Sequence, residues 1–259
     1  MILGLDIGNT NIEIGVLSEK KNDLTVKASA RFFTRNSLTS DELGFFILAF
    51  LDYHRIKKSS IKKAIYSSVV PPLNWSINKM CGDYFTKEII EVGSNTEMGI
   101  KNCYKNPGEV GSDRLVNAAC VHHLYKKNSI IVDMGTATTF CAVTKEGRYL
   151  GGAIMPGLMT SAEALTSKAA KLPAINIGRR TAILAENTVE AIEAGVYFSN
   201  LYSIRGIIEK LAGEAGFEDF IKAGTGGYMQ IFKKEIHFDY LDSSLTLKGL
   251  KIIADMNAG

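Results

Sequence analysis

The chain carries the same short pattern twice, once at its start and once near its middle. Residues 3–10 read LGLDIGNT and residues 130–137 read IIVDMGTA. In each copy an apolar strand leads to Asp, an apolar residue, Gly and then a hydroxyl or amide side chain. The two aspartates, Asp6 and Asp133, are separated by about half of the 259-residue chain. This repetition predicts two like domains that face each other across a cleft.

The alternation of apolar and polar residues around both copies is typical of an α/β protein. Ile12, Ile14 and Val16 alternate with polar or small residues, which predicts a half-buried strand that forms a hairpin with residues 2–7. Further strands are expected at 26–33, 64–70, 88–92, 129–133, 138–143, 149–155 and 220–223, and helices at 40–51, after Pro72, at 113–125, after Pro156, at 187–211 and around Ile252. Strands that give way to alternating helices and strands indicate α/β domains.

Composition and charge argue against several classes of function. The 30 Lys and Arg residues and 27 Asp and Glu residues are too balanced for the concentrated basic patch of a nucleic-acid-binding protein. The longest apolar run, residues 45–51, is too short to cross a bilayer, and the first residues lack the features of a signal peptide. The four cysteines are spread singly, as in a reducing compartment. We therefore expect a cytoplasmic protein that binds neither nucleic acid nor membranes.

Several well-known catalytic motifs are missing from the sequence. No Gly-Lys dipeptide occurs, which excludes a Walker A loop, and the glycines within 224–227 lack the spacing of a dinucleotide-binding fingerprint. Neither a His-Glu-x-x-His zinc motif nor a Gly-x-Ser-x-Gly nucleophile elbow is found. The two Asp-x-Gly segments at strand ends therefore become the main candidates for chemistry.

Each Asp-x-Gly segment has the residues of a phosphate cradle. A glycine lets backbone N–H groups approach phosphate oxygens, and a neighbouring hydroxyl adds a donor. A nearby carboxylate can hold Mg²⁺ directly or through water. Asp6 with residues 8–10 would supply one cradle, and Asp133 with Gly135, Thr136 and Thr138 would supply the other. Alternatively, each segment is an ordinary β-turn with a solvated aspartate.

Four longer stretches carry a more specific signal. They are residues 5–11 (LDIGNTN), 106–114 (NPGEVGSDR), 133–139 (DMGTATT) and 151–157 (GGAIMPG), with shorter matches at 171–173, 187–192, 225–227 and 247–250. Taken in order, they resemble type III pantothenate kinase, a family of the actin, hexokinase and sugar-kinase superfamily. The resemblance covers essentially the whole chain. It implies an α/β fold of two ribonuclease-H-like (actin-like ATPase) domains, 1–112 and 113–259, facing across a nucleotide cleft.

The resemblance also implies a role for each matching residue. ATP would be bound by the first phosphate loop, with Asp6 near Mg²⁺, and by Thr136; the loop comprises Asp6, Ile7, Gly8, Asn9, Thr10, Asn11, Ile12 and Glu13. Asp113 would be the catalytic base, and Asp133 would be a ligand of an activating K⁺ or NH₄⁺ ion. Pantothenate would be bound by Tyr104, Gly111, Ser112, Asp113, Arg114 and Thr188.

The implied activity is ATP-dependent phosphorylation of pantothenate to 4′-phosphopantothenate, the first step of coenzyme A biosynthesis. Two alternatives remain open. One is another small-molecule kinase of the same superfamily. The other is a non-catalytic regulatory accessory protein of the same family, which would be expected to lose Asp6, Asp113 or Asp133, and all three are present.

Ordinary structural explanations exist for several of these residues. Asp113 could serve only the dipole of a helix that Ser112 caps. Tyr104 could be a loop aromatic, and Thr188 could be an ordinary hydroxyl at a helix start. The sequence departs from the family pattern at Ser199, where glycine is often seen, and it matches loosely within 228–245, which affects the adenine side.

The helix expected at 187–211 points to self-association. It carries apolar residues on more than one side, and a helix of this kind must bury more than one side. The domain core can cover one face, and a symmetric partner is the simplest cover for the other. We therefore expect a homodimer, in which the resemblance implies that Thr188 reaches the pantothenate pocket of the neighbouring subunit.

Overall fold

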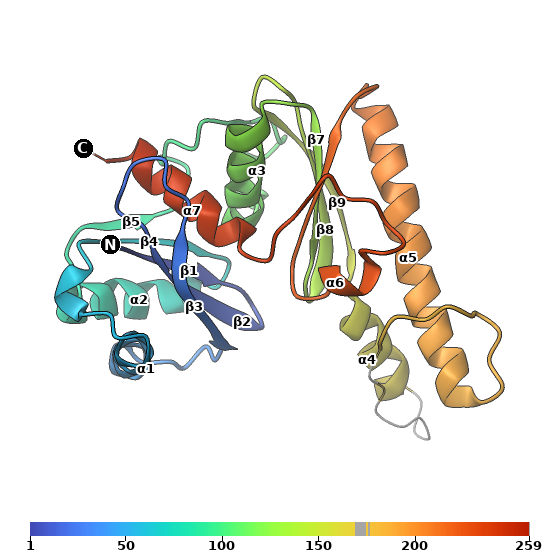
Figure 1. Ribbon diagram of the computed structural model, residues 1–259, viewed down its shortest axis with the longest axis horizontal. Coiled ribbons are helices and arrows are strands. Elements are labelled where there is room, and N and C mark those ends of the chain that lie inside the picture. The colour runs from blue at the N-terminus through green and yellow to red at the C-terminus, as the bar shows by residue number, and fades with distance from the viewer. Residues whose placement is uncertain (169–174, 176, 259) are drawn as a thin grey trace. The chain divides into compact units, whose positions relative to one another are not determined.

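The computed structural model describes residues 1–168, 175 and 177–258 (Figure 1). The short family match at 171–173 lies outside these residues. The chain divides into two compact units: the first contains Met1–Leu124 and the chain from Ser244 onward, and the second contains Tyr125–Ser243. Within the part of the chain that is described, no helix is long and apolar enough to cross a membrane.

A mixed five-stranded sheet forms the centre of the first unit. Its order is β3-β2-β1-β4-β5, with β1 at Ile2–Ile7, β2 at Asn11–Leu17, β3 at Val26–Phe33, β4 at Lys63–Ser68 and β5 at Ile89–Glu91. Strand β2 runs antiparallel to β1 and β3, whereas β4 runs parallel to β1 and β5 parallel to β4. The predicted hairpin is confirmed, because Ile7 pairs with Ile12 across β1 and β2.

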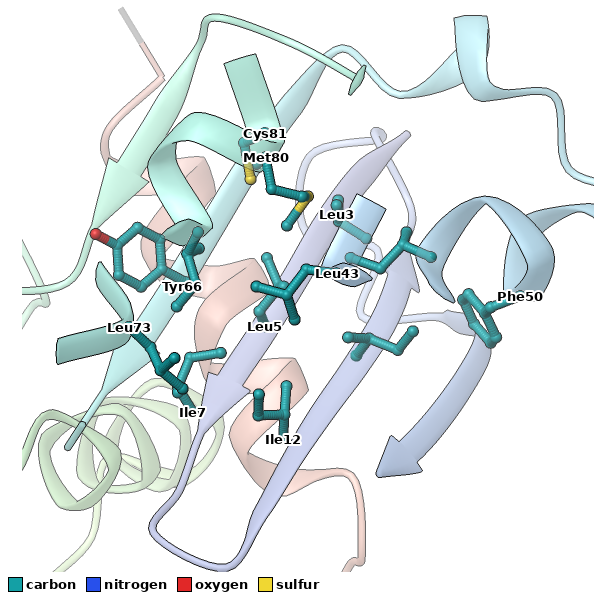
Figure 2. Packing of buried hydrophobic residues seen from close by; sticks show 14 of the residues in the cluster. Leu3, Leu5, Ile7, Ile12, Leu43, Phe50, Tyr66, Leu73, Met80 and Cys81 are labelled. Carbon is teal, nitrogen blue, oxygen red and sulfur yellow. The ribbon is translucent and has the colours of Figure 1, made fainter. Parts of the chain in front are cut away.

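Helices α1 (Ser40–Tyr53) and α2 (Pro71–Tyr84) pack against one face of this sheet. Helix α1 begins with a capping box between Thr39 and Glu42, and α2 has prolines in its first turn, where no N–H is needed. Figure 2 shows the apolar core between them, in which side chains of β1 and β2 meet those of both helices. This core fixes the inner face of β1, so the alternate residues of β1 must point to the opposite face.

The opposite face of the first sheet is covered by α7 (Leu245–Met256). Gly4 and Gly15 are paired there, and a Cβ on Gly15 would lie 2.8 Å from the Leu247 side chain. The two glycines therefore leave room for the leucine. Helix α3 (Ser112–Tyr125) packs close to α7, since a Cβ on Gly249 would lie 2.5 Å from the Val116 carbonyl oxygen. Short elements complete this unit: 3-10 turns at Lys58–Ser60 and Pro107–Glu109, and strand β6 at Lys101–Asn102.

The second unit is built around strands in the order β11-β10-β7-β8-β9. Their bounds are Ser129–Met134 for β7, Ala137–Val143 for β8, Arg148–Pro156 for β9, Ile221–Thr225 for β10 and Tyr240–Leu241 for β11. Helices α4 (Leu158–Lys168) and α5 (Thr188–Glu214) pack over β8, and α6 spans Met229–Phe232. The long α5 helix, orange in Figure 1, supplies a buried stripe that includes Val196, Tyr197 and Ile204.

The two units share one topology, as the repeated sequence pattern predicts. In both, the first strand pairs antiparallel with the second and parallel with the fourth, the third pairs antiparallel with the second, and the fifth pairs parallel with the fourth. Even an irregularity is repeated: the pairing of the second and third strands shifts register between Val16 and Leu17 in one unit and between Ala142 and Val143 in the other. The Asp-x-Gly segments occupy the same place in each unit, at the end of the first strand.

The compact units differ from the expected division at residues 112 and 113. Helix α3 belongs to the first unit through Leu124, and the chain returns to that unit at Ser244. The return has a packing cause, because the apolar side of α7 covers β1, β2 and β4 of the first sheet. The sequence places no obvious signal at either crossing.

Candidate active site

A polar row crosses the first sheet on the same face as α7. Asp6 of β1 pairs in register with Ser67 of β4 and with Glu13 of β2, and Glu13 pairs with Arg31 of β3. Directly opposed residues share a face, so the four side chains lie side by side. The Ser67 hydroxyl donates to Asp6 Oδ1 at 2.5 Å, and Arg31 forms an ion pair with Glu13. The Arg31 guanidinium therefore offsets part of the charge of Glu13, the carboxylate next to Asp6 in the row.

The loop that follows Asp6 joins β1 to β2. Gly8 N–H donates to the Asn11 carbonyl at 3.0 Å, which closes the turn, and Asn9 and Thr10 are exposed at its tip. Thr34, the residue after β3, contacts the loop twice. Its hydroxyl donates to the Gly8 carbonyl at 2.6 Å, and its N–H donates to the Thr10 carbonyl at 2.9 Å. Thr34, directly after β3, thus fixes the backbone of this loop at two carbonyl groups.

Asp113 lies in the first turn of α3, packed tightly on Gly111. A Cβ on Gly111 would lie 2.4 Å from Asp113 Oδ1, so any other residue at 111 would displace the carboxylate. Burial raises the pKa of the Asp113 carboxyl above its ordinary value, while the N–H and charge of Arg114 act in the opposite direction. The Arg114 N–H donates to Oδ1 at 2.8 Å, and the Arg114 side chain is itself buried.

The prediction that Ser112 caps α3 is wrong. The Gly111 carbonyl accepts the first helical N–H groups, from Arg114 at 3.1 Å and Leu115 at 3.4 Å. The Ser112 hydroxyl instead bridges to β4, where it accepts from the Ser68 N–H at 3.1 Å and donates to the Ser68 carbonyl at 3.2 Å. The hydroxyl is therefore used to join the start of α3 to the end of β4.

These bonds connect Asp6 and Asp113 through one strand end. Ser67 holds Asp6, and the next residue, Ser68, holds Ser112, which precedes Asp113. The Asp6 carboxylate and the start of the helix that carries Asp113 are thus both anchored at the carboxyl end of β4. Tyr104 lies in the loop before α3, where its N–H donates to Asn102 Oδ1 at 3.0 Å and its side chain is half-buried.

The second unit holds a matching cradle at the end of β7. Asp133 pairs in register with Thr225 of β10, the position that corresponds to Ser67, and Thr225 is buried. Gly226 follows with φ of +92°, and a Cβ there would lie 2.6 Å from Asp133 Oδ1 and 2.5 Å from Met134 N. Only glycine fits this position, because it needs both a left-handed backbone and the absence of a side chain.

The loop from β7 to β8 is also tied to the residues that follow the third strand. Gly135 N–H donates to the Ala137 carbonyl at 3.1 Å. The Thr136 carbonyl accepts twice, from Gly157 N–H at 2.9 Å and from the Thr160 hydroxyl at 2.6 Å. The backbone of the loop that contains Thr136 is thus fixed by Gly157, just before α4, and by Thr160 in the first turn of α4.

Thr188 is the first residue of α5, and its side chain is exposed. The helix is capped by its neighbour, since Asn187 Oδ1 accepts from the Glu190 N–H at 3.0 Å. The Thr188 hydroxyl is therefore not needed to cap the helix. It belongs to the second unit together with Asp133 and Thr136, whereas Asp6, Tyr104 and residues 111–114 belong to the first.

Sequence reasoning missed the hydroxyl residues that support these loops, namely Thr34, Ser67 and Thr160. Single Ser and Thr residues at strand ends are common, so they carry no motif. Position gives a signal only for Thr34, which directly follows the strand expected at 26–33; Ser67 lies inside the strand expected at 64–70, and Thr160 in the helix expected after Pro156.

The residues present suit a magnesium ion that keeps most of its water. Within the described residues, no three His, Cys, Asp or Glu side chains gather closely enough to hold a metal ion. A carboxylate at Asp6 would then share the ion with water and phosphate oxygens, which is the usual environment of Mg²⁺. At the second cradle, the single acidic residue Asp133 suits a more weakly held monovalent cation.

Comparisons with known proteins agree with this architecture. A model of the type III pantothenate kinase family matches residues 2–210. A Campylobacter jejuni protein named for the Baf family of transcriptional activators has a TM-score of 0.62 and 18% identity, and the match covers 98% of each chain. A Sinorhizobium meliloti protein named for 2-dehydro-3-deoxygalactonokinase has a TM-score of 0.59 and 12% identity, with 99% of this chain and 97% of that chain covered.

A third solved structure contains a bound nucleotide analogue. The activator of 2-hydroxyisocaproyl-CoA dehydratase from Clostridium difficile, with ADPNP, has a TM-score of 0.50 and 13% identity over 98% of this chain and 93% of that chain. The structural likenesses concern the fold alone. Together with the shared topology of the two units, they confirm the expected pair of ribonuclease-H-like α/β domains.

Proposed function

Because the chain belongs to the type III pantothenate kinase family, we propose that it transfers the γ-phosphoryl group of ATP to the primary hydroxyl of pantothenate. The product is 4′-phosphopantothenate, and the reaction is the first step of coenzyme A biosynthesis. The observation that carries the proposal is that Asp6 and the start of α3, which carries Asp113, are both anchored at the end of β4. A phosphoryl-transfer site needs one carboxylate for the metal and one for the attacking hydroxyl, held in fixed relation.

Asp113 acts as the general base. Its carboxylate accepts the proton of the pantothenate hydroxyl as the new P–O bond forms and the bond from the γ-phosphorus to the bridging oxygen breaks, releasing ADP. Burial raises the pKa of this carboxyl, which strengthens it as a base, and the Arg114 N–H fixes the position of Oδ1. Tyr104, Gly111, Ser112 and Arg114 line the pantothenate pocket, with the fixed cation of Arg114 suited to an anionic group.

The two loops bind ATP through backbone groups. Residues 6–13 form the first phosphate loop, and Thr136 contacts the phosphates from the second unit. Asp6 holds Mg²⁺ directly or through water, and Asp133 with backbone carbonyls holds K⁺ or NH₄⁺. When bound, these cations neutralise the negative charge of the phosphates. The protein residues supply position, which is the main requirement of this chemistry.

A homodimer is the assembly that we propose. One side of α5 is buried in the second unit, while the other side is exposed over several turns. The exposed side presents small residues at helical spacing beside one large ring: Ala191, Gly195, Ser199, Tyr202 and Gly206. Small residues allow another helix to approach closely, and a second copy of α5 would bury this side about a two-fold axis. Thr188, exposed at the start of the same helix, would then contact the partner's pantothenate.

The test is a phosphorylation assay with purified protein, ATP and Mg²⁺, in KCl or in NaCl. We expect pantothenate to be phosphorylated, with higher activity in potassium, and the Asp133→Ala variant should lose that preference. A panel of other hydroxyl acceptors separates this kinase from others of the superfamily. Phosphorylation of a different acceptor alone would replace pantothenate as the substrate, and no turnover of any acceptor would favour an accessory role.

A further inference from the structure

Both loops share a feature that their sequences do not: a threonine hydroxyl tied to a loop carbonyl. In the first unit, Thr34 donates its hydroxyl to the Gly8 carbonyl at 2.6 Å and its N–H to the Thr10 carbonyl at 2.9 Å. In the second unit, the Thr136 carbonyl receives the Thr160 hydroxyl at 2.6 Å and the Gly157 N–H at 2.9 Å. The N–H donors come from equivalent places, the residue directly after β3 and the residue directly after β9.

The direction of these bonds decides the direction of the loop amides. A trans peptide plane holds its C=O and the following N–H antiparallel. A carbonyl tied toward Thr34 or Thr160 therefore turns the next N–H to the other side of the loop. In the first loop these are the N–H groups of Asn9 and Asn11, and in the second loop the N–H of Ala137. Successive N–H groups turned to one side form a concave site for anions, whereas carbonyls on that side would repel a phosphate.

The two bonds to the Thr136 carbonyl also require close contact between two backbone segments. A Cβ on Gly157 would lie 2.2 Å from the Gly135 carbonyl oxygen and 2.5 Å from the Thr136 carbonyl oxygen. Glycine at 157 lets the two backbones meet. The first loop achieves the same result with Thr34 alone, which supplies both the N–H and the hydroxyl.

Ordinary continuation of the sheet explains only part of this arrangement. The N–H bonds of Thr34 and Gly157 extend the pairing of the second and third strands by one step. The hydroxyl bonds lie outside the sheet ladder. They also come from different elements, since Thr34 ends a strand and Thr160 lies in the first turn of α4. A threonine hydroxyl thus reaches a loop carbonyl from two unrelated positions in the fold, which indicates a requirement of the loops themselves.

We propose that Thr34 and Thr160 are positioning residues that turn the amides of the two loops toward the phosphates of the nucleotide. The role rests on the proposed function only in that the loops bind ATP; it does not depend on which acceptor is phosphorylated. Neither threonine contacts the reacting atoms. Each acts through the backbone of the loop it holds.

The test measures nucleotide binding by calorimetry with Mg²⁺ and without any acceptor. Thr34→Val and Thr160→Val keep the branched shape and remove the hydroxyl. Each should raise the Kd for ATP roughly three- to tenfold, the effect of one lost hydrogen bond, and should raise the Kd for AMP less, because fewer phosphates are held. Thr34→Ser and Thr160→Ser keep the hydroxyl and should bind ATP nearly as the unmodified protein does.

Thr86→Val is the matched control. The Thr86 hydroxyl also donates to a carbonyl, that of Lys62 at 2.7 Å, but at the opposite end of the same sheet. This variant should bind ATP normally. Thermal unfolding shows which variants are folded, and the two threonines lie in different units, so either one tests the idea if the other fails to fold.

The inference is overturned if folded valine variants bind ATP like the unmodified protein, if the serine variants are as weak as the valine variants, or if ATP and AMP lose affinity equally. An unmodified chain that binds no ATP would remove the proposed function and this inference with it. Normal binding by every variant would remove the inference alone.

Discussion

Replacing Asp113 with asparagine should separate catalysis from stability. Asp113→Asn keeps the size of the side chain and an oxygen that can accept the Arg114 N–H, but it removes the proton acceptor. Loss of a general base lowers turnover by about 10²-fold or more, which corresponds to at least ~2.7 kcal/mol of transition-state stabilisation. Binding of ATP should survive, because the two loops proposed to hold the phosphates do not include this residue.

Although Asp113→Asn should lower turnover, it should not lower the stability of the fold. Burial raises the pKa of Asp113 above its ordinary value of 3.8, so the native state holds this proton more tightly than the unfolded state. Stability is then lost as pH rises from 3.8 through the raised native value, and the full cost is present at neutral pH. Removing the charge should therefore leave the unfolding midpoint at pH 7 unchanged or higher. The same raised pKa predicts that kcat/KM falls on the acid side at a pH above the ordinary aspartate value of 3.8.

The assay pairs turnover with urea unfolding, and Asp41→Asn is the matched control. Asp41 also lies in the first turn of a helix, α1, where its carboxylate accepts from the Tyr84 hydroxyl at 2.8 Å. If Asp113 served only the helix dipole, both variants would lose a little stability and neither would lose activity. Near-normal turnover of Asp113→Asn, or a clear loss of stability at neutral pH, would refute the reasoning.

Three further changes test other parts of the molecule. Ser67→Ala removes a hydrogen bond to a carboxylate and should weaken activation by Mg²⁺ about tenfold or more; an unchanged Mg²⁺ titration would show that Asp6 needs no such support. Gly226→Ala forces a side chain into a left-handed position against Met134, so urea unfolding should show a loss of ~1–3 kcal/mol or more, and unaltered stability would contradict the tight packing. The Asp113→Asn and Thr188→Arg proteins, each inactive alone, can be mixed so that they exchange subunits. If subunits pair at random and each site is shared, about a quarter of all sites should regain activity. No recovery, after mass measurement has proved the exchange, would confine Thr188 to its own subunit.

The repeated pattern made most of the fold predictable. Alternating apolar residues gave strand positions close to the observed ones, and the two Asp-x-Gly copies predicted two units of like topology. Local periodicity suffices for these features because strands and helices bury one face each. The return of α7 to the first sheet was beyond such reasoning, since it depends on Leu247 fitting over Gly4 and Gly15, which lie far away in the sequence.

The candidate site was predictable only in part. Asp6, Asp113 and Asp133 stand in motifs, and a resemblance can assign them roles. The side chains that hold them have no motif: Ser67 is one serine among several, and its partner Asp6 is set by strand register. For Ser112, the position in the sequence led to a wrong prediction. Its position before a helix suggests a cap, but the nearby backbone of Ser68 takes the hydroxyl instead.

The path of the chain through the two units has a consequence for biosynthesis. On a ribosome the strands of the first sheet emerge before the second unit, yet the helix that covers their second face, α7, is made only after it. The residues from Tyr125 to Ser243 form a contiguous unit that can fold as soon as it is exposed. The first unit must wait with Gly4, Gly15 and the surrounding apolar surface open to solvent. The strands of the first sheet, which are translated before the second unit, are thus completed only after it, and nascent chains stalled before residue 245 should keep that face available to chaperones.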